Sequence, residues 1–266
     1  MKPLKINDMI LEPGRPKIAI PISGRTHEEI VAQCEDAVEG PCDILEWRVD
    51  YYLNTIGNLD QKVENMQVHP ELVRILDDID YVAEGKPVIF TVRGGTQGGL
   101  KPISRKSAYD LGRIAAQSQL VSIVDMDLFE EDDTFDADEV MEQVDAIHEY
   151  GVKVILSYHD FEHILSREEI INLVSLMRNL GADICKIAVT SESRDEVDEL
   201  VKTAALVTEG DNGPVIILAM GEEGRVTRIA GGEYGSCITY AAGTKATAPG
   251  QMSAEFLSEM LDKFYK

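Results

Sequence analysis

Short apolar runs alternate with amphipathic stretches along almost the whole chain. Eight of these runs are short and largely apolar, which is typical of strands buried on both faces of a parallel sheet. Between them, apolar residues recur every three to four positions, as they do on one face of a helix. The predicted strands are 17–22, 43–48, 87–92, 121–128, 152–158, 183–189, 214–220 and 236–240, and the predicted helices include 28–39, 106–117, 138–150, 168–179 and 196–207.

Start and stop signals of helices agree with this order. Three predicted helices begin with a Ser or Thr that is followed three residues later by Glu, the spacing of a capping box. Glycines stand just before three of the later strands, where the preceding helix has to end. The capping residues are Thr26, Ser166 and Ser193, and the glycines are Gly181, Gly213 and Gly235.

The alternation predicts an α/β fold, a (β/α)8 barrel. Eight strands with helices between them in 266 residues suit one barrel of ordinary size. We therefore expect a single domain over residues 1–266, with a short N-terminal extension over 1–15. An open doubly wound sheet is the alternative, but the chain contains neither a G-x-G-x-x-G motif nor a P-loop.

Charge and cysteine usage narrow the possible partners. Asp and Glu number 48 against 25 Lys and Arg, so the net charge is −23, which repels nucleic acid and anionic membrane surfaces. The N-terminus lacks the apolar segment of a signal peptide, and the longest apolar run, 215–220, is far too short to span a bilayer. The four cysteines form no C-x-x-C pair. We expect reduced thiols in a cytoplasmic protein that binds neither nucleic acid nor membrane.

Lys186 is the most informative candidate for chemistry. It stands in the middle of the predicted strand 183–189, where its side chain cannot easily reach water. Burying an ammonium is costly unless it is paired, and burial lowers the pKa of a lysine. A neutral amine in a closed pocket can form a Schiff base with a carbonyl compound. The alternative is a structural ion pair with Glu46 or with an aspartate of the fourth strand.

His159 ends the fifth predicted strand, next to Lys186 in barrel order, and is a candidate general acid and base; a structural histidine is the alternative. His159 and His163 are four residues apart, but the sequence is not H-E-x-x-H, so no metal site is expected. The acidic run 130–133 lacks the EF-hand pattern and indicates a solvated loop. The glycine-rich segment 94–99 lacks phosphate-binding spacing and indicates a hinge or lid.

Three arginines are predicted to lie at the same rim of the barrel. Arg48 and Arg93 end strands, and Arg228 follows the seventh strand. Such a group in an acidic protein indicates a carboxylate or polyhydroxy acid as ligand. In the last loop, Thr247 and Gln251 could hydrogen-bond a hydroxylated ligand, although an ordinary Pro-Gly turn explains the same residues.

Six motifs, in order from residue 16 to the C-terminus, resemble type I 3-dehydroquinate dehydratases. The resemblance implies a (β/α)8 barrel, a homodimer, and no metal or organic cofactor. It implies dehydration of 3-dehydroquinate to 3-dehydroshikimate, the third step of the shikimate pathway of aromatic amino-acid biosynthesis. The motifs are Leu-Glu-Trp-Arg-Val-Asp at 45–50, Phe-Thr-Val-Arg at 90–93, Ser-Tyr-His-Asp-Phe at 157–161, Cys-Lys-Ile-Ala at 185–188, Thr-Arg-Ile-Ala-Gly at 227–231 and Ala-Thr-Ala-Pro-Gly-Gln at 246–251.

The resemblance also implies roles for individual residues. Lys186 matches the Schiff-base nucleophile, and His159 matches the general base that removes a proton beside the imine and later helps protonate the departing hydroxyl. Arg228 is expected to bind the substrate carboxylate. The matching substrate-binding positions are Glu46, Arg48, Arg93, Arg228, Thr247, which stands where the family more often has serine, and Gln251.

One position departs from the family motif. Gln97 stands where a glutamate, thought to support the catalytic histidine, is common, and a neutral amide cannot hold a negative charge beside an imidazolium. Asp125 or Asp127 is the alternative source of that charge. Two other functions stay open: a class I aldolase or transaldolase, for which a phosphate loop is missing, and an inactive barrel kept as a binding module, which only Gln97 suggests.

Overall fold

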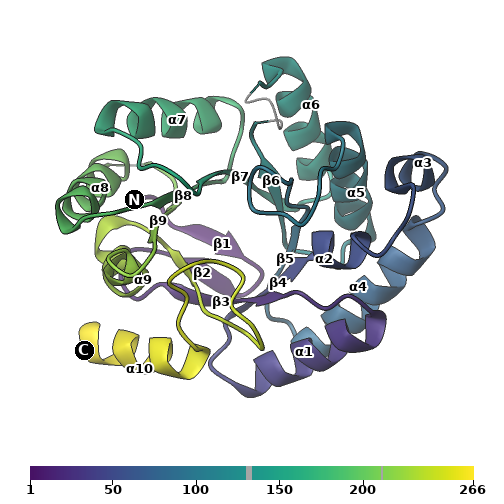
Figure 1. The fold of residues 1–266 in the computed structure, drawn as a ribbon, viewed down its shortest axis with the longest axis horizontal. Helices are drawn as coiled ribbons and strands as arrows, with labels where there is room; N and C mark the ends of the chain where they lie inside the picture. Colours follow the sequence, from purple (N-terminus) through teal and green to yellow (C-terminus); the bar gives the residue numbers. More distant parts are fainter. Residues whose placement is uncertain (130–133, 211) are drawn as a thin grey trace.

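The computed structural model describes residues 1–129, 134–210 and 212–266. In this part of the chain, eight parallel strands form a barrel with the helices outside it (Figure 1). Between the first and last strands of the order, Val215 and Ser236 form a parallel bridge that brings the barrel nearly to closure. The strand order is β10 (Ile238–Tyr240), β3 (Lys17–Ile22), β4 (Ile44–Arg48), β5 (Val88–Thr91), β6 (Ile123–Asp127), β7 (Lys153–Asp160), β8 (Ile184–Thr190) and β9 (Val215–Met220).

The predicted fold class and all eight predicted strands are confirmed, with ends that differ by no more than two residues. The same holds for the five predicted helices. The acidic run 130–133 lies outside the described residues. The helices are α1 (His27–Glu39), α2 (Val49–Leu53), α3 (Leu59–Glu64), α4 (His69–Ala83), α5 (Arg105–Ser118), α6 (Ala137–His148), α7 (Arg167–Asn179), α8 (Arg194–Val207), α9 (Arg225–Ala230) and α10 (Ala254–Phe264), with a 3-10 turn η1 (Gly231–Tyr234).

Two of the three predicted capping boxes are complete. Ser166 and Ser193 each accept a hydrogen bond from the backbone three residues on, and the glutamate there bonds back to the cap. At α1, Thr26 accepts from the Glu29 N–H at 3.2 Å, but the Glu29 carboxylate accepts from the Arg25 N–H instead. This third cap is therefore only half of the predicted box.

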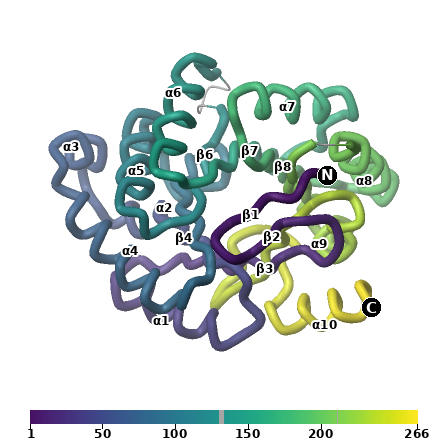
Figure 2. The backbone as a smooth tube through the Cα atoms, turned by 180° about the vertical axis from the view of Figure 1, so that it is seen from behind, coloured from purple at the N-terminus to yellow at the C-terminus, as the bar shows by residue number. Residues whose placement is uncertain are grey.

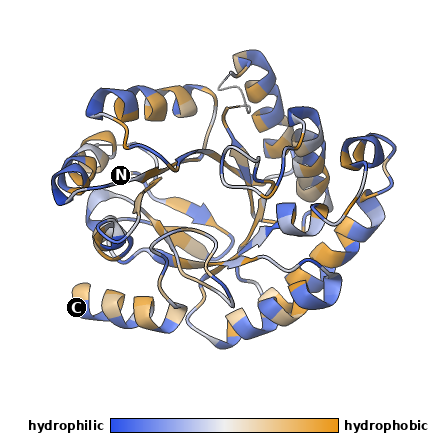
Figure 3. Ribbon diagram, in the orientation of Figure 1, coloured by the Kyte–Doolittle hydropathy of each residue, from blue (hydrophilic) through white to orange (hydrophobic). Residues whose placement is uncertain are grey.

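Alternation along the strands separates the apolar and polar contents of the barrel. Trp47 of β4 points outward and packs on Phe90 of β5, with ring centroids 5.7 Å apart. Its neighbours Glu46 and Arg48 therefore point into the barrel, because successive side chains of a strand face opposite sides. Helices turn their apolar sides toward the strands and their polar sides outward (Figure 3). Within the described residues, no helix has the length and hydrophobicity needed to cross a membrane.

The predicted N-terminal extension contains a hairpin. Strands β1 (Leu4–Ile6) and β2 (Met9–Leu11) pair antiparallel and lie across the N-terminal end of the barrel (Figure 2). Ile6 and Leu11 are buried there against a group of inward-facing isoleucines at the bases of the strands. These isoleucines are Ile44, Ile89, Ile123, Ile155, Ile184, Ile216 and Ile238.

Shortening the Leu11 side chain of the hairpin should destabilise the barrel. Leu11 is 0% exposed, so Leu11→Ala leaves a cavity in the barrel floor and should cost about 2–5 kcal/mol of unfolding free energy. Urea denaturation would measure this cost. Ile10→Ala is the matched control, because the neighbouring Ile10 is 46% exposed. Equal effects of the two substitutions would show that the hairpin does not seal the floor.

Candidate active site

Polar side chains from successive strands meet inside the barrel near the C-terminal ends of the strands. In the strand register, Thr91 is level with Asp125, Asp127 with Ser157, and Ser157 with Lys186. All except Asp127 are nearly inaccessible to solvent. A parallel barrel brings these strand ends to one face, which is where such folds place their active sites.

Lys186 is buried and paired. Its Nζ lies 2.7 Å from Asp125 Oδ2 and 3.7 Å from Glu46 Oε1, and Glu46 Oε1 also accepts a hydrogen bond from Thr91 Oγ1 at 3.0 Å. The same Nζ lies over the ring of Tyr240, 4.5 Å from its centroid. The ion pair that the sequence left open as an alternative is thus present. The ion-paired amine still lines the cavity described below, so a ligand in that cavity can reach it.

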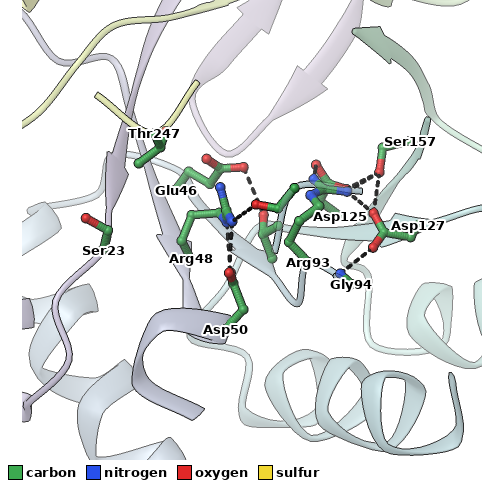
Figure 4. Close-up of polar contacts among 12 residues, drawn as sticks. Ser23, Glu46, Arg48, Asp50, Arg93, Gly94, Asp125, Asp127, Ser157 and Thr247 are labelled. Atoms are coloured by element: carbon green, nitrogen blue, oxygen red, sulfur yellow. Dashed lines mark hydrogen bonds and ion pairs between the residues drawn. The ribbon is translucent and has the colours of Figure 1, made fainter. Parts of the chain in front are cut away.

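Arg93 organises the carboxylates beside the lysine. Its guanidinium contacts Asp125 Oδ2 at 2.9 Å, Ser157 Oγ at 2.7 Å and the carboxylate of Asp127. Ser157 donates in turn to Asp125 Oδ1 at 2.6 Å, and the Gly94 N–H donates to Asp127 Oδ2 at 2.7 Å (Figure 4). These contacts hold Asp125 in one orientation, with its Oδ2 shared between two cations.

The two aspartates of this network have opposite pKa shifts. Burial opposes ionisation of Asp125, but the cations of Arg93 and Lys186 outweigh it and hold its pKa well below the ordinary value. Burial raises the pKa of Asp127, and the neighbouring Asp125 charge adds to this effect against the attraction of Arg93. Asp125 is therefore the lasting negative charge next to Lys186.

Arg48 is anchored by a residue that the sequence reasoning did not single out. Asp50, in the first turn of α2, pairs with it bidentately, with both distances 2.8 Å (Figure 4). Arg48 also donates to the Gly98 carbonyl at 3.3 Å and lies over the ring of Tyr51. The Arg-Val-Asp spacing was a visible signal, because residues two apart can bond across the end of a strand. Asp50 fixes the direction in which Arg48 reaches into the site.

His159 lies half-buried at the end of β7. Its backbone N–H donates to Gln97 Oε1 at 2.7 Å, and no described residue bonds its ring Nδ1. Desolvation, followed by the cations of Arg93 and Lys186, lowers the pKa of the imidazole well below 6.5, and Asp125 offsets this only in part. The ring is therefore neutral near neutral pH. Gln97 hydrogen-bonds the backbone of His159. The negative charge that acts on the imidazole, which a neutral glutamine cannot supply, comes from Asp125.

Arg228 and the last loop close the other side of the site. Arg228 is 2% exposed and donates to the backbone carbonyls of Tyr240 at 3.4 Å and Pro249 at 3.1 Å. Burial lowers its pKa to about 10, so it remains a cation, and no carboxylate in the described part of the chain pairs with it. Gln251 Oε1 accepts from the Thr247 N–H at 2.7 Å, which shapes the loop. An anion is the natural partner for this unpaired guanidinium.

The structure brings all the predicted site residues to one cavity of about 60 Å³. A larger hollow of about 450 Å³ lies behind Gln97 and Asp127, against α5, and no predicted catalytic residue lines it. Tyr240, which the sequence reasoning missed, also lines the smaller cavity. The predicted residues that line it are Glu46, Arg48, Arg93, His159, Lys186, Arg228, Thr247 and Gln251.

Comparison with known proteins shows which family the chain belongs to. The family model for type I 3-dehydroquinase matches residues 18–266. The chain belongs to the type I 3-dehydroquinase family. It is 34% identical over 266 residues to the 3-dehydroquinate dehydratase of Alkaliphilus oremlandii, covering 100% of this chain and 98% of that protein. The type I 3-dehydroquinate dehydratase of Clostridium difficile superposes with a TM-score of 0.87 at 30% identity, covering 100% and 99% of the two chains.

The family assignment confirms the resemblance seen in the six motifs. This type I 3-dehydroquinase is a hydro-lyase that acts on a small molecule. The assignment also sets aside the class I aldolase or transaldolase, which belongs to another family.

Proposed function

We propose that this enzyme dehydrates 3-dehydroquinate to 3-dehydroshikimate through a Schiff base on Lys186, as the third step of the shikimate pathway. The observation that carries the proposal is a buried lysine amine that shares one cavity with a neutral histidine and an unpaired arginine. The solved relative from Clostridium difficile is described as carrying covalently modified comenic acid. A covalent route is therefore compatible with this fold.

Lys186 starts the reaction as a nucleophile. Its amine must be neutral to attack, and the neutral imidazole of His159 is the base in the cavity that can receive its proton. The nitrogen adds to the ketone carbon of the substrate, and His159 returns the proton that it took from the amine to the ketone oxygen. His159 then moves a second proton from the nitrogen to the same oxygen, which leaves as water, so that His159 is again neutral. The product of this step is a protonated imine, whose positive charge Asp125, 2.7 Å from Nζ, is placed to stabilise.

His159 then carries the elimination. The protonated imine withdraws electrons and acidifies the proton on the adjacent carbon, which His159 removes. The electron pair moves toward the imine as an enamine and then expels the hydroxyl group, which receives the proton from His159. Hydrolysis of the product imine returns the free amine of Lys186. A histidine with a lowered pKa suits this role, since it starts the cycle without a proton.

The remaining residues hold the substrate. Arg228 binds the carboxylate, because its charge has no carboxylate partner among the described residues and its Nε is unbonded. Arg48, Glu46, Thr247 and Gln251 offer donors and acceptors for the hydroxyl groups. Arg93 also lines the cavity, but its bonds to Asp125, Asp127 and Ser157 make it chiefly a positioning residue. We also propose that the enzyme is a cytoplasmic homodimer, as the resemblance implies. Sedimentation velocity would test the dimer.

Borohydride reduction in the presence of 3-dehydroquinate tests the covalent route. We expect an adduct on Lys186, located by mass mapping of the peptides, and absorbance of the enone product in an unreduced sample. An adduct on another lysine would assign the nucleophile elsewhere. A folded protein that forms neither adduct nor enone would refute the proposed function.

The pH dependence of kcat/KM should reveal the perturbed histidine. His159 acts as a base, so activity rises with pH as it loses its proton, and a lowered pKa moves this rise to lower pH. We therefore expect kcat/KM to fall on the acidic side with an apparent pKa below 6.5, the ordinary value for histidine. The initial rate of enone formation over a pH series would measure it. An apparent pKa at or above that value would mean that another group controls the reaction.

A further inference from the structure

The Tyr240 side chain places a hydroxyl group in the active site, and no described residue forms a hydrogen bond with it. The residue ends β10, is 5% exposed and lines the same cavity as Lys186. Its phenol oxygen has no hydrogen-bond partner among the described residues. A buried hydroxyl without a partner costs stability, and most buried polar groups in proteins avoid that state. A partner supplied by the bound substrate would account for it.

The charges around Tyr240 keep its proton in place. Burial raises the pKa of the phenol well above 10, and the carboxylates of Glu46 and Asp125 raise it further. The hydroxyl therefore stays neutral throughout the range in which His159 titrates. It can donate a hydrogen bond but is unsuited to giving up its proton.

The other groups in contact with the nucleophile cannot make this bond. Asp125 and Glu46, at 2.7 and 3.7 Å from Nζ, are carboxylates, and an ionised carboxylate only accepts hydrogen bonds. The Lys186 nitrogen lies over the Tyr240 ring at 4.5 Å. A carbon atom bonded to that nitrogen brings its own oxygen close to the same ring. The tyrosine is thus a neutral donor beside the bond that forms, and its hydroxyl is not used by any described residue.

We propose that Tyr240 is a further catalytic residue, whose hydroxyl donates a hydrogen bond to the substrate ketone oxygen while Lys186 adds to the ketone carbon. The proposal rests on the Schiff-base function given above. Donors placed where negative charge develops are among the strongest contributors to catalysis. The Tyr240 side chain is buried, and such a bond is stronger away from water.

The step balances without any further reactant. As the bond between Nζ and the ketone carbon forms, the electron pair of the carbonyl moves to its oxygen, and the Tyr240 hydroxyl stabilises that oxygen without transferring its proton. His159 gives the oxygen the proton that it took from the amine before the attack and then moves a second proton from the nitrogen to it. The oxygen leaves as water, and the nitrogen keeps its last proton in the protonated imine. When the product imine is hydrolysed, the Tyr240 hydroxyl donates a hydrogen bond to the oxygen of the attacking water.

The test compares Tyr240→Phe with a control on the same strand. Tyr240→Phe removes one oxygen atom and keeps the ring that packs on Lys186. Thr239→Val is the matched control, because the Thr239 hydroxyl is also buried without a partner among the described residues, but alternation turns it away from the barrel interior. The readouts are the rate of borohydride trapping on Lys186 with 3-dehydroquinate in single turnover, and kcat/KM for enone formation.

We expect Tyr240→Phe to slow trapping about 10²-fold, the usual cost of removing one donor to a developing oxyanion, and Thr239→Val to trap as the wild type does. Both variants should melt no lower than the wild type, because each loses an unbonded hydroxyl. If Tyr240→Phe is trapped at the wild-type rate, the role proposed for Tyr240 is overturned and the Schiff-base function is not. Failure of the wild-type enzyme to be trapped would overturn the Schiff-base function and this proposal with it.

Discussion

Lys186→Met should abolish the dehydration of 3-dehydroquinate, lowering kcat by about 10⁴-fold or more. Methionine keeps the length of the side chain but has no amine, so no imine can form. Enone absorbance measures the loss, and borohydride treatment should leave the peptide around residue 186 unmodified. The variant also leaves Glu46 and Asp125 without the cation now 3.7 and 2.7 Å away, so a lower melting temperature should accompany the loss of activity.

Lys153→Met separates the loss of activity from the loss of stability. Lys153 is at the start of β7, at the opposite end of the barrel, and its Nζ contacts Asp183 Oδ1 at 2.9 Å. The substitution removes an ion pair of a barrel strand without touching the cavity. We expect nearly full activity from it. Substantial turnover by folded Lys186→Met would place the nucleophile on another residue.

His159→Asn should lower kcat by about 10² to 10⁴-fold, the range that general acid–base catalysis contributes. Asparagine keeps the backbone N–H that bonds Gln97, at 2.7 Å in the native enzyme, but it cannot accept and return protons. The covalent adduct should still accumulate on Lys186 after reduction, though more slowly. The measurements are the enone rate and the mass of the reduced protein.

His163→Asn is the control for that substitution. The His163 side chain is 74% exposed and lies 3.7 Å from Asp160, outside the cavity. It should leave kcat and the pH profile unchanged. If both variants behave alike, or if His159→Asn retains full kcat, the general base is not His159.

The order and type of the main elements could be predicted from the sequence because their signals are local. Continuous apolar runs such as 214–220 have no polar face, so they require burial on both sides, and helical periodicity between such runs favours a parallel arrangement. Capping boxes at Ser166 and Ser193 depend only on residues three apart. The hairpin at 4–11 gave no comparable signal, since its two strands of three residues are stabilised by the barrel floor beneath them.

The sequence by itself determined the barrel and the set of residues at its catalytic end. The period of two along each strand decides which side chains face inward, and parallel strands all end at the same face. Lys186, His159 and Arg228 therefore meet in one cavity although 69 residues of chain separate the first and last of them in sequence.

Only the tertiary structure decided which of these groups bond to one another. Asp125 rather than Asp127 pairs with Lys186, Gln97 bonds the backbone of His159, and the Tyr240 hydroxyl is left without a partner. Such choices depend on the stagger between strands and on side-chain rotamers in a packed interior, where differences of an ångström select the partner. No local pattern along the chain carries that information, because every partner comes from a different strand.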